Sequence, residues 1–123
     1  MSVQVSVRRV ASYDTDLTVE LRKLLAPLGG MRAFVNPGEK VLLKPNLLGP
    51  FAPESAVTTH PAVVEAAARL VLEAGGRCFV GDSSGCGSRD SVLRATGIGE
   101  VMRRLSADGL EARDMALTPR TLA

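Results

Sequence analysis

Two short apolar runs with an amphipathic stretch between them constrain the fold of this 123-residue chain more than any other feature. The first run, Lys40–Lys44, is apolar between its two lysines and stops at Pro45, which is typical of a buried strand. The second run, Cys78–Val80, is followed by a glycine. A strand, a helix and a strand at this spacing form a βαβ unit, in which the strands are parallel and the connection is right-handed. The sequence therefore predicts an α/β fold.

The stretch between the two runs has the pattern of a helix. Pro61 suits the first helical position, and Thr59 or His60 stands where a cap belongs. Gly75–Gly76 ends the pattern. One apolar stripe runs along the stretch and consists of Val63, Val64, Ala67, Leu70, Val71 and Ala74.

Weaker patterns on both sides of this unit predict further elements. Val3, Val5 and Val7 alternate with polar residues, which is typical of a half-buried strand. Leucines spaced over residues 17–28 predict an amphipathic helix that ends at Gly29–Gly30. Three more elements are expected later in the chain: a helix capped by Ser88 or Asp90, a helical stretch over residues 99–106 and a weak strand over residues 111–115.

Length and composition place these elements in one α/β domain over residues 1–123, with a two-layer or three-layer Rossmann-like arrangement and a small, mainly parallel sheet. Aromatic residues make up only 3% of the chain and its net charge is +2, so we expect no nucleic-acid partner. No apolar run approaches the roughly 18–20 residues of a membrane span, and the N-terminus lacks a signal-peptide core. The cytoplasm is therefore the expected location, without a membrane partner.

Polar residues gather at the points where the two apolar runs end. Lys44–Asn46 leaves the first run and Gly81–Gly85 leaves the second. Because parallel strands end at the same edge of a sheet, both exits are expected at the edge where open α/β sheets bind ligands. The start of the Pro61 helix faces that edge too. The residues expected to converge there are Lys44, Asn46, Thr58, Thr59, His60, Asp82, Ser83, Ser84 and Gly85.

The residue types at this edge suit a small anion such as phosphate or a carboxylate. A helix start presents unpaired backbone N–H groups and a partial positive charge, and Lys44 adds an ammonium group. Glycines let the backbone approach a ligand closely. The expected ligand-binding residues are Asn46, Thr58, Thr59, Ser83, Ser84 and Gly85.

Three side chains at the edge are candidates for catalysis: Lys44, His60 and Asp82. Asp82 can orient a hydroxyl, hold a cation or act as a base, and the His60 imidazole is suited to proton transfer near neutral pH. Each also has a simpler interpretation, in which Lys44 ends a strand, His60 caps a helix and Asp82 braces its loop. Ser83 occupies the centre of a Gly-x-Ser-x-Gly string, which keeps a hydrolase as a minor alternative. Whether the protein is an enzyme stays open at this point.

The two cysteines are too few for a disulfide framework or an iron–sulfur cluster within the chain. Cys78 lies in the second apolar run and is expected to be a small buried hydrophobe. Cys86 lies in the glycine-rich loop, where an exposed thiol can react. A metal site formed by His60, Asp82 and Cys86 is an alternative, but the expectation is that this chain holds no metal and no cofactor by itself.

Three linked motifs resemble the family called domain of unknown function 362. They are Lys44–Leu47, Thr58–Pro61 and Val80–Gly85, although the family usually has proline where Ser84 stands. The resemblance implies an uncharacterised domain of redox or cofactor-related context, whose members often carry a ferredoxin-type iron–sulfur module after it. It also implies that this chain corresponds to the N-terminal part of a longer family domain.

Two functions are consistent with these observations. In the first, the chain binds a small anion at the carboxyl edge of its sheet, as part of a redox or cofactor-related enzyme. In the second, it is a non-catalytic structural or interaction half that pairs with a partner domain, an iron–sulfur partner or a second copy of itself.

Overall fold

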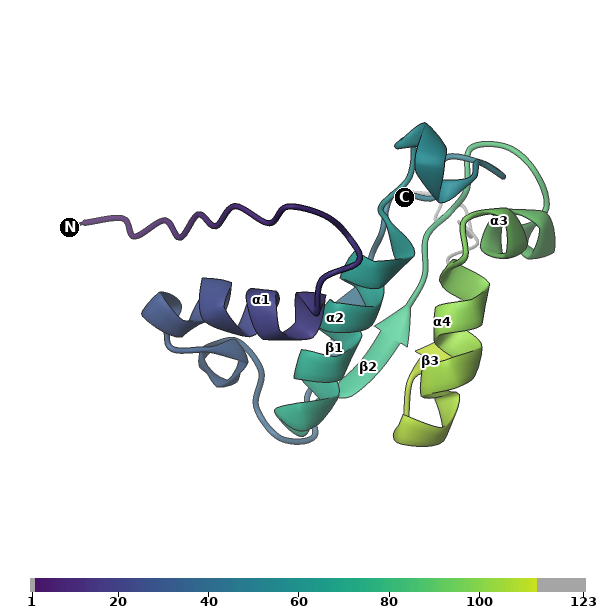
Figure 1. Cartoon of the computed structure of the whole chain (residues 1–123). Helices are drawn as coiled ribbons and strands as arrows, with labels where there is room; N and C mark the ends of the chain where they lie inside the picture. The colour runs from purple at the N-terminus through teal and green to yellow at the C-terminus, as the bar shows by residue number, and fades with distance from the viewer. Residues whose placement is uncertain (1, 113–123) are drawn as a thin grey trace, which may run out of the picture.

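A small parallel sheet with helices packed against it forms the centre of the molecule (Figure 1). The computed structural model describes residues 2–112. Its three strands, β1 (Lys40–Leu43), β2 (Arg77–Val80) and β3 (Glu111–Ala112), lie in that order and are all parallel. Helix α2 (Pro61–Glu73) connects β1 to β2, so the predicted βαβ unit and the α/β fold are confirmed. The rest of the strand expected over residues 111–115 lies outside the described residues.

The other helices begin and end close to the predicted signals. Asp16 caps α1 by accepting hydrogen bonds from the backbone N–H groups of Thr18 and Val19. Ser88 caps α3 by accepting from the N–H of Ser91. The remaining elements are α1 (Leu17–Leu25), α3 (Arg89–Ala95), α4 (Ile98–Leu105) and four 3₁₀ turns, η1 (Ala26–Leu28), η2 (Met31–Ala33), η3 (Pro53–Ser55) and η4 (Ser106–Asp108).

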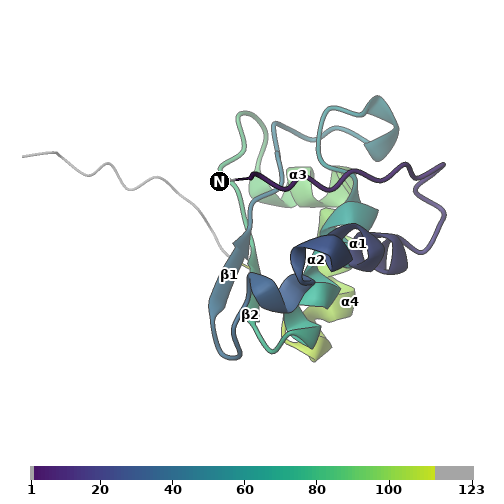
Figure 2. The same ribbon diagram turned by 90° about the vertical axis from the view of Figure 1, so that its left-hand side faces the viewer.

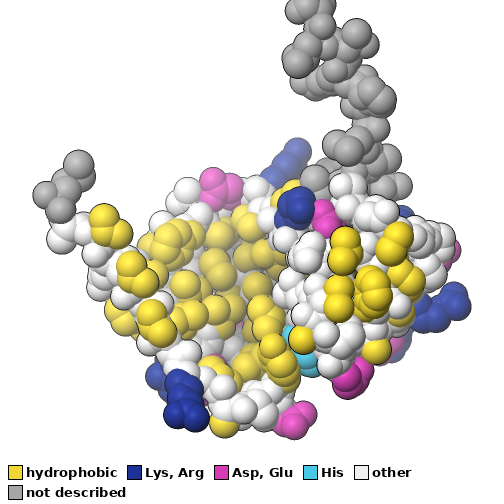
Figure 3. All heavy atoms as spheres, turned by 90° about the horizontal axis from the view of Figure 1, so that it is seen from above, with side chains coloured by type: hydrophobic (Ala, Val, Ile, Leu, Met, Phe, Trp, Pro, Cys, Tyr) yellow, Lys and Arg dark blue, Asp and Glu magenta, His cyan; other side chains and the backbone are white. Residues whose placement is uncertain are grey.

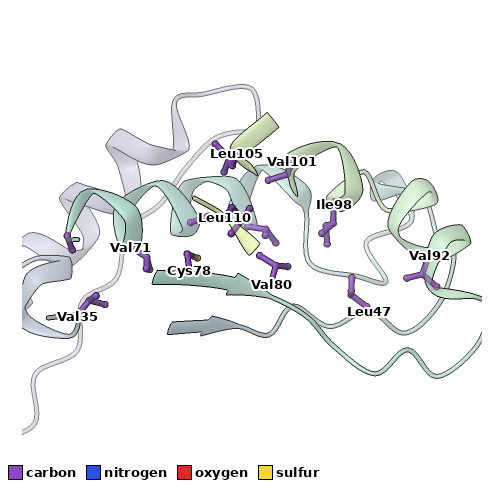
Figure 4. Close-up of a cluster of buried hydrophobic side chains, with 13 residues drawn as sticks. Val35, Leu47, Val71, Cys78, Val80, Val92, Ile98, Val101, Leu105 and Leu110 are labelled. Carbon is purple, nitrogen blue, oxygen red and sulfur yellow. The ribbon is translucent and has the colours of Figure 1, made fainter. Parts of the chain in front are cut away.

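The core lies between the sheet and the helices. Figure 2 shows α1, α2 and α4 on one side of β1 and β2, so the described residues form two layers. The core side chains of α4 and β2 meet above the sheet (Figure 4). Cys78 is fully buried among them, as predicted, and its burial raises the pKa of its thiol to about 11. The largest fully buried side chains are Leu70, Ile98, Leu105, Val71, Val80, Val92 and Val101.

The strand predicted at the N-terminus is wrong for the described structure. Residues 2–10 are extended but belong to no sheet, and Val3, Val5 and Val7 are 90%, 77% and 88% exposed. A strand exists only where a neighbour completes its backbone hydrogen bonds, and none of the described strands lies beside this segment.

Strand β1 is also less buried than its apolar run suggests. It pairs only with β2 and forms an edge of the sheet, and Leu42 on it is 45% exposed. A continuous apolar run indicates burial on both faces only when layers cover both faces of the strand. The described helices cover one face, so every second side chain of β1 is left partly uncovered.

Candidate functional site

The exits of β1 and β2 meet through an ion pair, as the topology predicted. The Nζ atom of Lys44 lies 2.7 Å from Oδ1 of Asp82. The Asp82 side chain is only 5% exposed, whereas that of Lys44 is 57% exposed. The other carboxylate oxygen of Asp82, Oδ2, accepts a hydrogen bond of 2.9 Å from the backbone N–H of Leu47. A buried carboxylate therefore holds an exposed ammonium group at the carboxyl edge of the sheet.

The surroundings of Asp82 keep it ionised. Burial alone would raise the pKa of Asp82, but the hydrogen bonds from Lys44 and from the Leu47 N–H outweigh that effect and hold the pKa below its ordinary value. Both carboxylate oxygens are engaged at neutral pH. Asp82 thus braces the loop and anchors Lys44, and a role as a base requires this ion pair to open.

The segment before α2 is tied to the exit of β1. The Oγ1 atom of Thr59 accepts a hydrogen bond of 3.2 Å from the backbone N–H of Asn46. The side-chain amide of Asn46 donates to the Val57 carbonyl at 3.4 Å. Thr58 is only 8% exposed, and its Oγ1 is buried without a hydrogen-bond partner in the described part of the chain. A buried hydroxyl in that state costs free energy unless a bound molecule satisfies it.

The start of α2 corrects one prediction. The Nδ1 atom of His60 accepts a hydrogen bond of 3.2 Å from the Ala62 N–H, and the His60 carbonyl accepts one of 3.0 Å from the Val63 N–H. Pro61 has no N–H group to offer. The prediction that this helix start presents unpaired N–H groups to an anion is therefore wrong, because the chain satisfies them itself. Only the partial positive charge of the helix end remains.

His60 has a ring partner that the sequence did not indicate. Its imidazole stacks on the ring of Tyr13, with centroids 3.8 Å apart and planes 1° from parallel. The contact fixes the ring in the orientation in which Nδ1 caps α2. In the sequence Tyr13 only precedes the first helix, and no local pattern links it to a histidine so far along the chain. Neither Lys44 nor Asp82 is a hydrogen-bond partner of His60 within residues 2–112.

The glycine-rich loop after β2 is joined to the segment after β1. The backbone N–H groups of Gly85 and Cys86 both donate to the Leu48 carbonyl at 3.0 Å. A Cβ atom on Gly49 would stand 2.5 Å from Sγ of Cys86, so glycine there lets the two segments approach closely without displacing that side chain. The hydrogen bonds to Leu48 thus join the two strand exits.

Two serines of this loop have hydroxyl groups with no hydrogen-bond partner in the described part of the chain. Ser83 is exposed and Ser84 is half-buried, and neither hydroxyl bonds to another described residue. Ser83 has no hydrogen bond to His60, so the minor hydrolase alternative gains no support from this geometry. These hydroxyls and the Lys44 ammonium together give this edge hydrogen-bond donors for an anion.

No metal centre forms among the residues that the structure describes. In residues 2–112, no group of three or more His, Cys, Asp or Glu side chains could hold a metal ion, and His60, Asp82 and Cys86 form no such group. The cysteines do not fit an iron–sulfur cluster either, because Cys78 is buried within a strand and Cys86 is exposed on a loop. Among the same residues, no helix is long and apolar enough to cross a membrane.

Comparison with known proteins places this edge in a family. The family model described as "Domain of unknown function (DUF362)" matches residues 41–121, which include both strand exits and α2. The thylakoid-associated protein sll1697 of Synechocystis sp. is 46% identical over 114 residues. That match covers 92% of this chain but 36% of the relative, so the chain spans about a third of the relative's length. No solved structure matches the chain significantly.

Proposed function

This chain belongs to the DUF362 family of domains of unknown function, and we propose that it binds a small anion at the carboxyl edge of its sheet. The observation that carries the proposal is the ion pair between Lys44 and Asp82. A side chain as exposed as that of Lys44 would ordinarily move among many rotamers, and ordering it costs conformational entropy. The ion pair with the buried Asp82 carboxylate already orders the Lys44 side chain, so the ammonium group is preorganised for a ligand.

The donors around Lys44 suit phosphate or a carboxylate. An ammonium group has three N–H donors. One of these points to Asp82, which leaves the others for a ligand at the exposed side of the edge. The hydroxyls of Ser83 and Ser84, which bond to no described residue, supply further donors. Because Asp82 neutralises most of the Lys44 charge, hydrogen bonding rather than net charge would provide the selectivity.

The proposal divides the candidate residues by role. Lys44 would bind the anion, with Asn46, Thr58, Ser83, Ser84 and Gly85 forming its surroundings. Asp82 would position Lys44, and Thr59 and His60 would position the neighbouring backbone. Work as part of a redox or cofactor-related enzyme, with an iron–sulfur cluster in a fused or partner module, is a further proposal that the family resemblance alone supports. The cytoplasmic location also stays a prediction, and the relative's name associates that protein with the thylakoid.

Titration with inorganic phosphate tests the anion site. We expect the backbone amide resonances of Lys44, Asn46, Leu47 and residues 81–85 to shift in a saturable way at constant ionic strength. Lys44→Met should weaken the apparent affinity by about tenfold, the value of one charge-assisted hydrogen bond. Lys23→Met is the matched control, because Lys23 is similarly exposed and also pairs with a carboxylate, that of Glu20.

Two results would refute the anion site. One is an unchanged affinity in Lys44→Met while the spectrum shows that the fold is intact. The other is a set of phosphate-induced shifts that lies away from both strand exits. Asp82→Asn provides a second variant, since it keeps Lys44 but removes its anchor and frees its charge; these effects oppose each other, so it should change the affinity less than Lys44→Met does.

A second candidate function is a domain that assembles with another folded unit. The observation that favours it is the N-terminal segment, where Val3, Val5 and Val7 are almost fully exposed in an extended conformation. Exposed apolar surface of this kind marks interaction sites in soluble proteins. The two candidates use different surfaces of the chain and do not exclude each other.

A further inference from the structure

The N-terminal segment Ser2–Val10, called the arm below, lies against α1 by its polar side chains. In Figure 1 the arm runs beside α1, and its bonds show that the two run in opposite directions. Three alternate side chains of the arm bond to α1 or to the turn that follows it. These bonds join Gln4 Nε2 to the Pro27 carbonyl (3.0 Å), Ser6 Oγ to the Leu24 carbonyl (2.6 Å) and the Arg8 guanidinium to Glu20. The arm is therefore held in place by one of its two faces.

The opposite face and the backbone of the arm have no partner among residues 2–112. The side chains of Val3, Val5 and Val7 alternate with the bonded ones and point away from α1, with exposures of 77% to 90%. The arm makes no backbone hydrogen bond to any described residue. It thus has the shape of a strand that lacks both a neighbouring strand and a cover for its apolar face.

We propose that the arm adds as a strand to the sheet of a second folded unit, and that this unit also covers the valine face. This second unit is the remainder of a longer DUF362 protein, outside the region to which this chain corresponds. The inference deepens the second candidate function above. In the Synechocystis relative, the region that matches this chain makes up only 36% of the length. With α1 on one face and an apolar layer on the other, the arm would lie within a layered α/β sheet.

A second copy of this chain fits the arm less well. Antiparallel pairing about Val5 would set Val3 opposite Val7 and keep the Arg8 side chains at opposite ends. Opposed residues in such a pair point to the same face, so both α1 helices would lie on the polar face. All the valines would then stay exposed on the other face. A partner that supplies both a strand and an apolar layer would pair the backbone of the arm and also cover its valine face.

The apolar surface continues beyond the arm. A groove of about 120 Å³ adjoins it between the arm, α1 and α2, and its lining is apolar apart from the Arg8–Glu20 ion pair. The apolar residues of the lining are Val10, Leu17, Leu21, Leu24, Val63 and Ala66. Seen from above, Figure 3 shows hydrophobic side chains along the arm and across the hollow beside it. The proposed unit would cover this groove together with the valine face, which gives an interface larger than one strand provides.

Hydrogen exchange of two proteins tests the inference. One is this chain, and the other is a chimaera in which this chain replaces the matched 114-residue region of the Synechocystis relative. Amides of residues 3–7 should exchange near the unprotected rate in the chain alone, and on the order of 100-fold more slowly in the chimaera. The triple variant V3T/V5T/V7T should lower that protection about tenfold, because it keeps the β-branched shape but not the apolar surface. Val19→Thr is the matched control, since Val19 is an exposed valine on α1.

Three outcomes would overturn the inference. The first is rapid exchange of the arm in a chimaera whose β2 amides remain protected. The second is protection in the isolated chain that rises with its concentration, which identifies a second copy as the partner. If the chimaera does not fold, the intact relative is measured instead, and rapid exchange of the segment just before its counterpart of α1 is the third. None of these measurements involves phosphate or Lys44, so the anion site stands or fails separately.

Discussion

Replacing Asp82 should destabilise the fold more than replacing Lys44, although the two form one ion pair. Asp82→Ala leaves the Leu47 N–H without an acceptor, and Leu47 is only 4% exposed. An unsatisfied buried donor costs about 1–3 kcal/mol. The Lys44 bond itself contributes at most about 1 kcal/mol, because its ammonium group is largely in water, but its removal also leaves the buried Oδ1 atom of Asp82 without that partner. We therefore expect a loss of about 2–3 kcal/mol in Asp82→Ala and of about 1–2 kcal/mol in Lys44→Met.

Urea denaturation of the three proteins measures these free energies of unfolding, provided that the slope with urea stays the same. The pH dependence gives an independent check. The pKa of Asp82 is lower in the folded state than the value of about 3.9 in an unfolded chain. Its stabilisation is therefore complete above that unfolded value and is lost as the pH falls through the folded pKa. The gap between wild type and Asp82→Ala should stay constant from neutral pH to about pH 5 and narrow below about pH 4.

Two results would refute this reasoning. A loss in Lys44→Met as large as that in Asp82→Ala would mean that the ammonium group, not the Leu47 N–H, dominates the interaction. A gap between wild type and Asp82→Ala that does not narrow in acid would mean that Asp82 is not an ionised acceptor in the folded protein. Asp82→Asn separates the two bonds further, since its amide oxygen can still accept from Leu47 while its charge is gone.

Three further predictions concern the core and the cysteines. A thiol reagent at pH 8 should label Cys86 alone until the chain unfolds, because Cys78 is buried and its thiol pKa is about 11; two labels on the folded protein by mass spectrometry would contradict this. Gly76→Ala should lower the free energy of unfolding by about 1–3 kcal/mol. The added Cβ would stand 2.7 Å from Cγ1 of Val35, and an unchanged urea midpoint would argue against that crowding. Ile98→Ala should cost about 2–5 kcal/mol, since the side chain is fully buried in the core, and calorimetry showing less than 1 kcal/mol would disprove it.

The βαβ unit could be predicted because its determinants are local. Pro45 ends the first strand and Pro61 begins the helix that follows, and both signals act within one or two residues. Parallel pairing then follows from chain connectivity, so the meeting of Lys44 with Asp82 needed no knowledge of side-chain packing. Topology alone brought these two side chains to one edge.

The details of the site could not be predicted in the same way. Whether a helix start is free to bind an anion depends on which acceptors reach its first N–H groups. Here His60 reaches Ala62, and the stacking partner of His60 is Tyr13, which is distant in sequence. Spacing along the chain carries no information about such a contact. Likewise, the burial of the Thr58 hydroxyl without a partner among residues 2–112 depends on packing that only the folded chain defines.

The arm shows what an alternating pattern does and does not specify. Alternation of Val3, Val5 and Val7 with polar residues predicts two faces of different polarity, and the structure has those two faces. It does not specify which face meets the rest of the chain, and here the polar face does, through Gln4 and Ser6. An ordinary surface strand buries its apolar face instead. If the valines become protected in the longer protein, the predicted half-buried strand is correct for that assembly, although not for the chain alone.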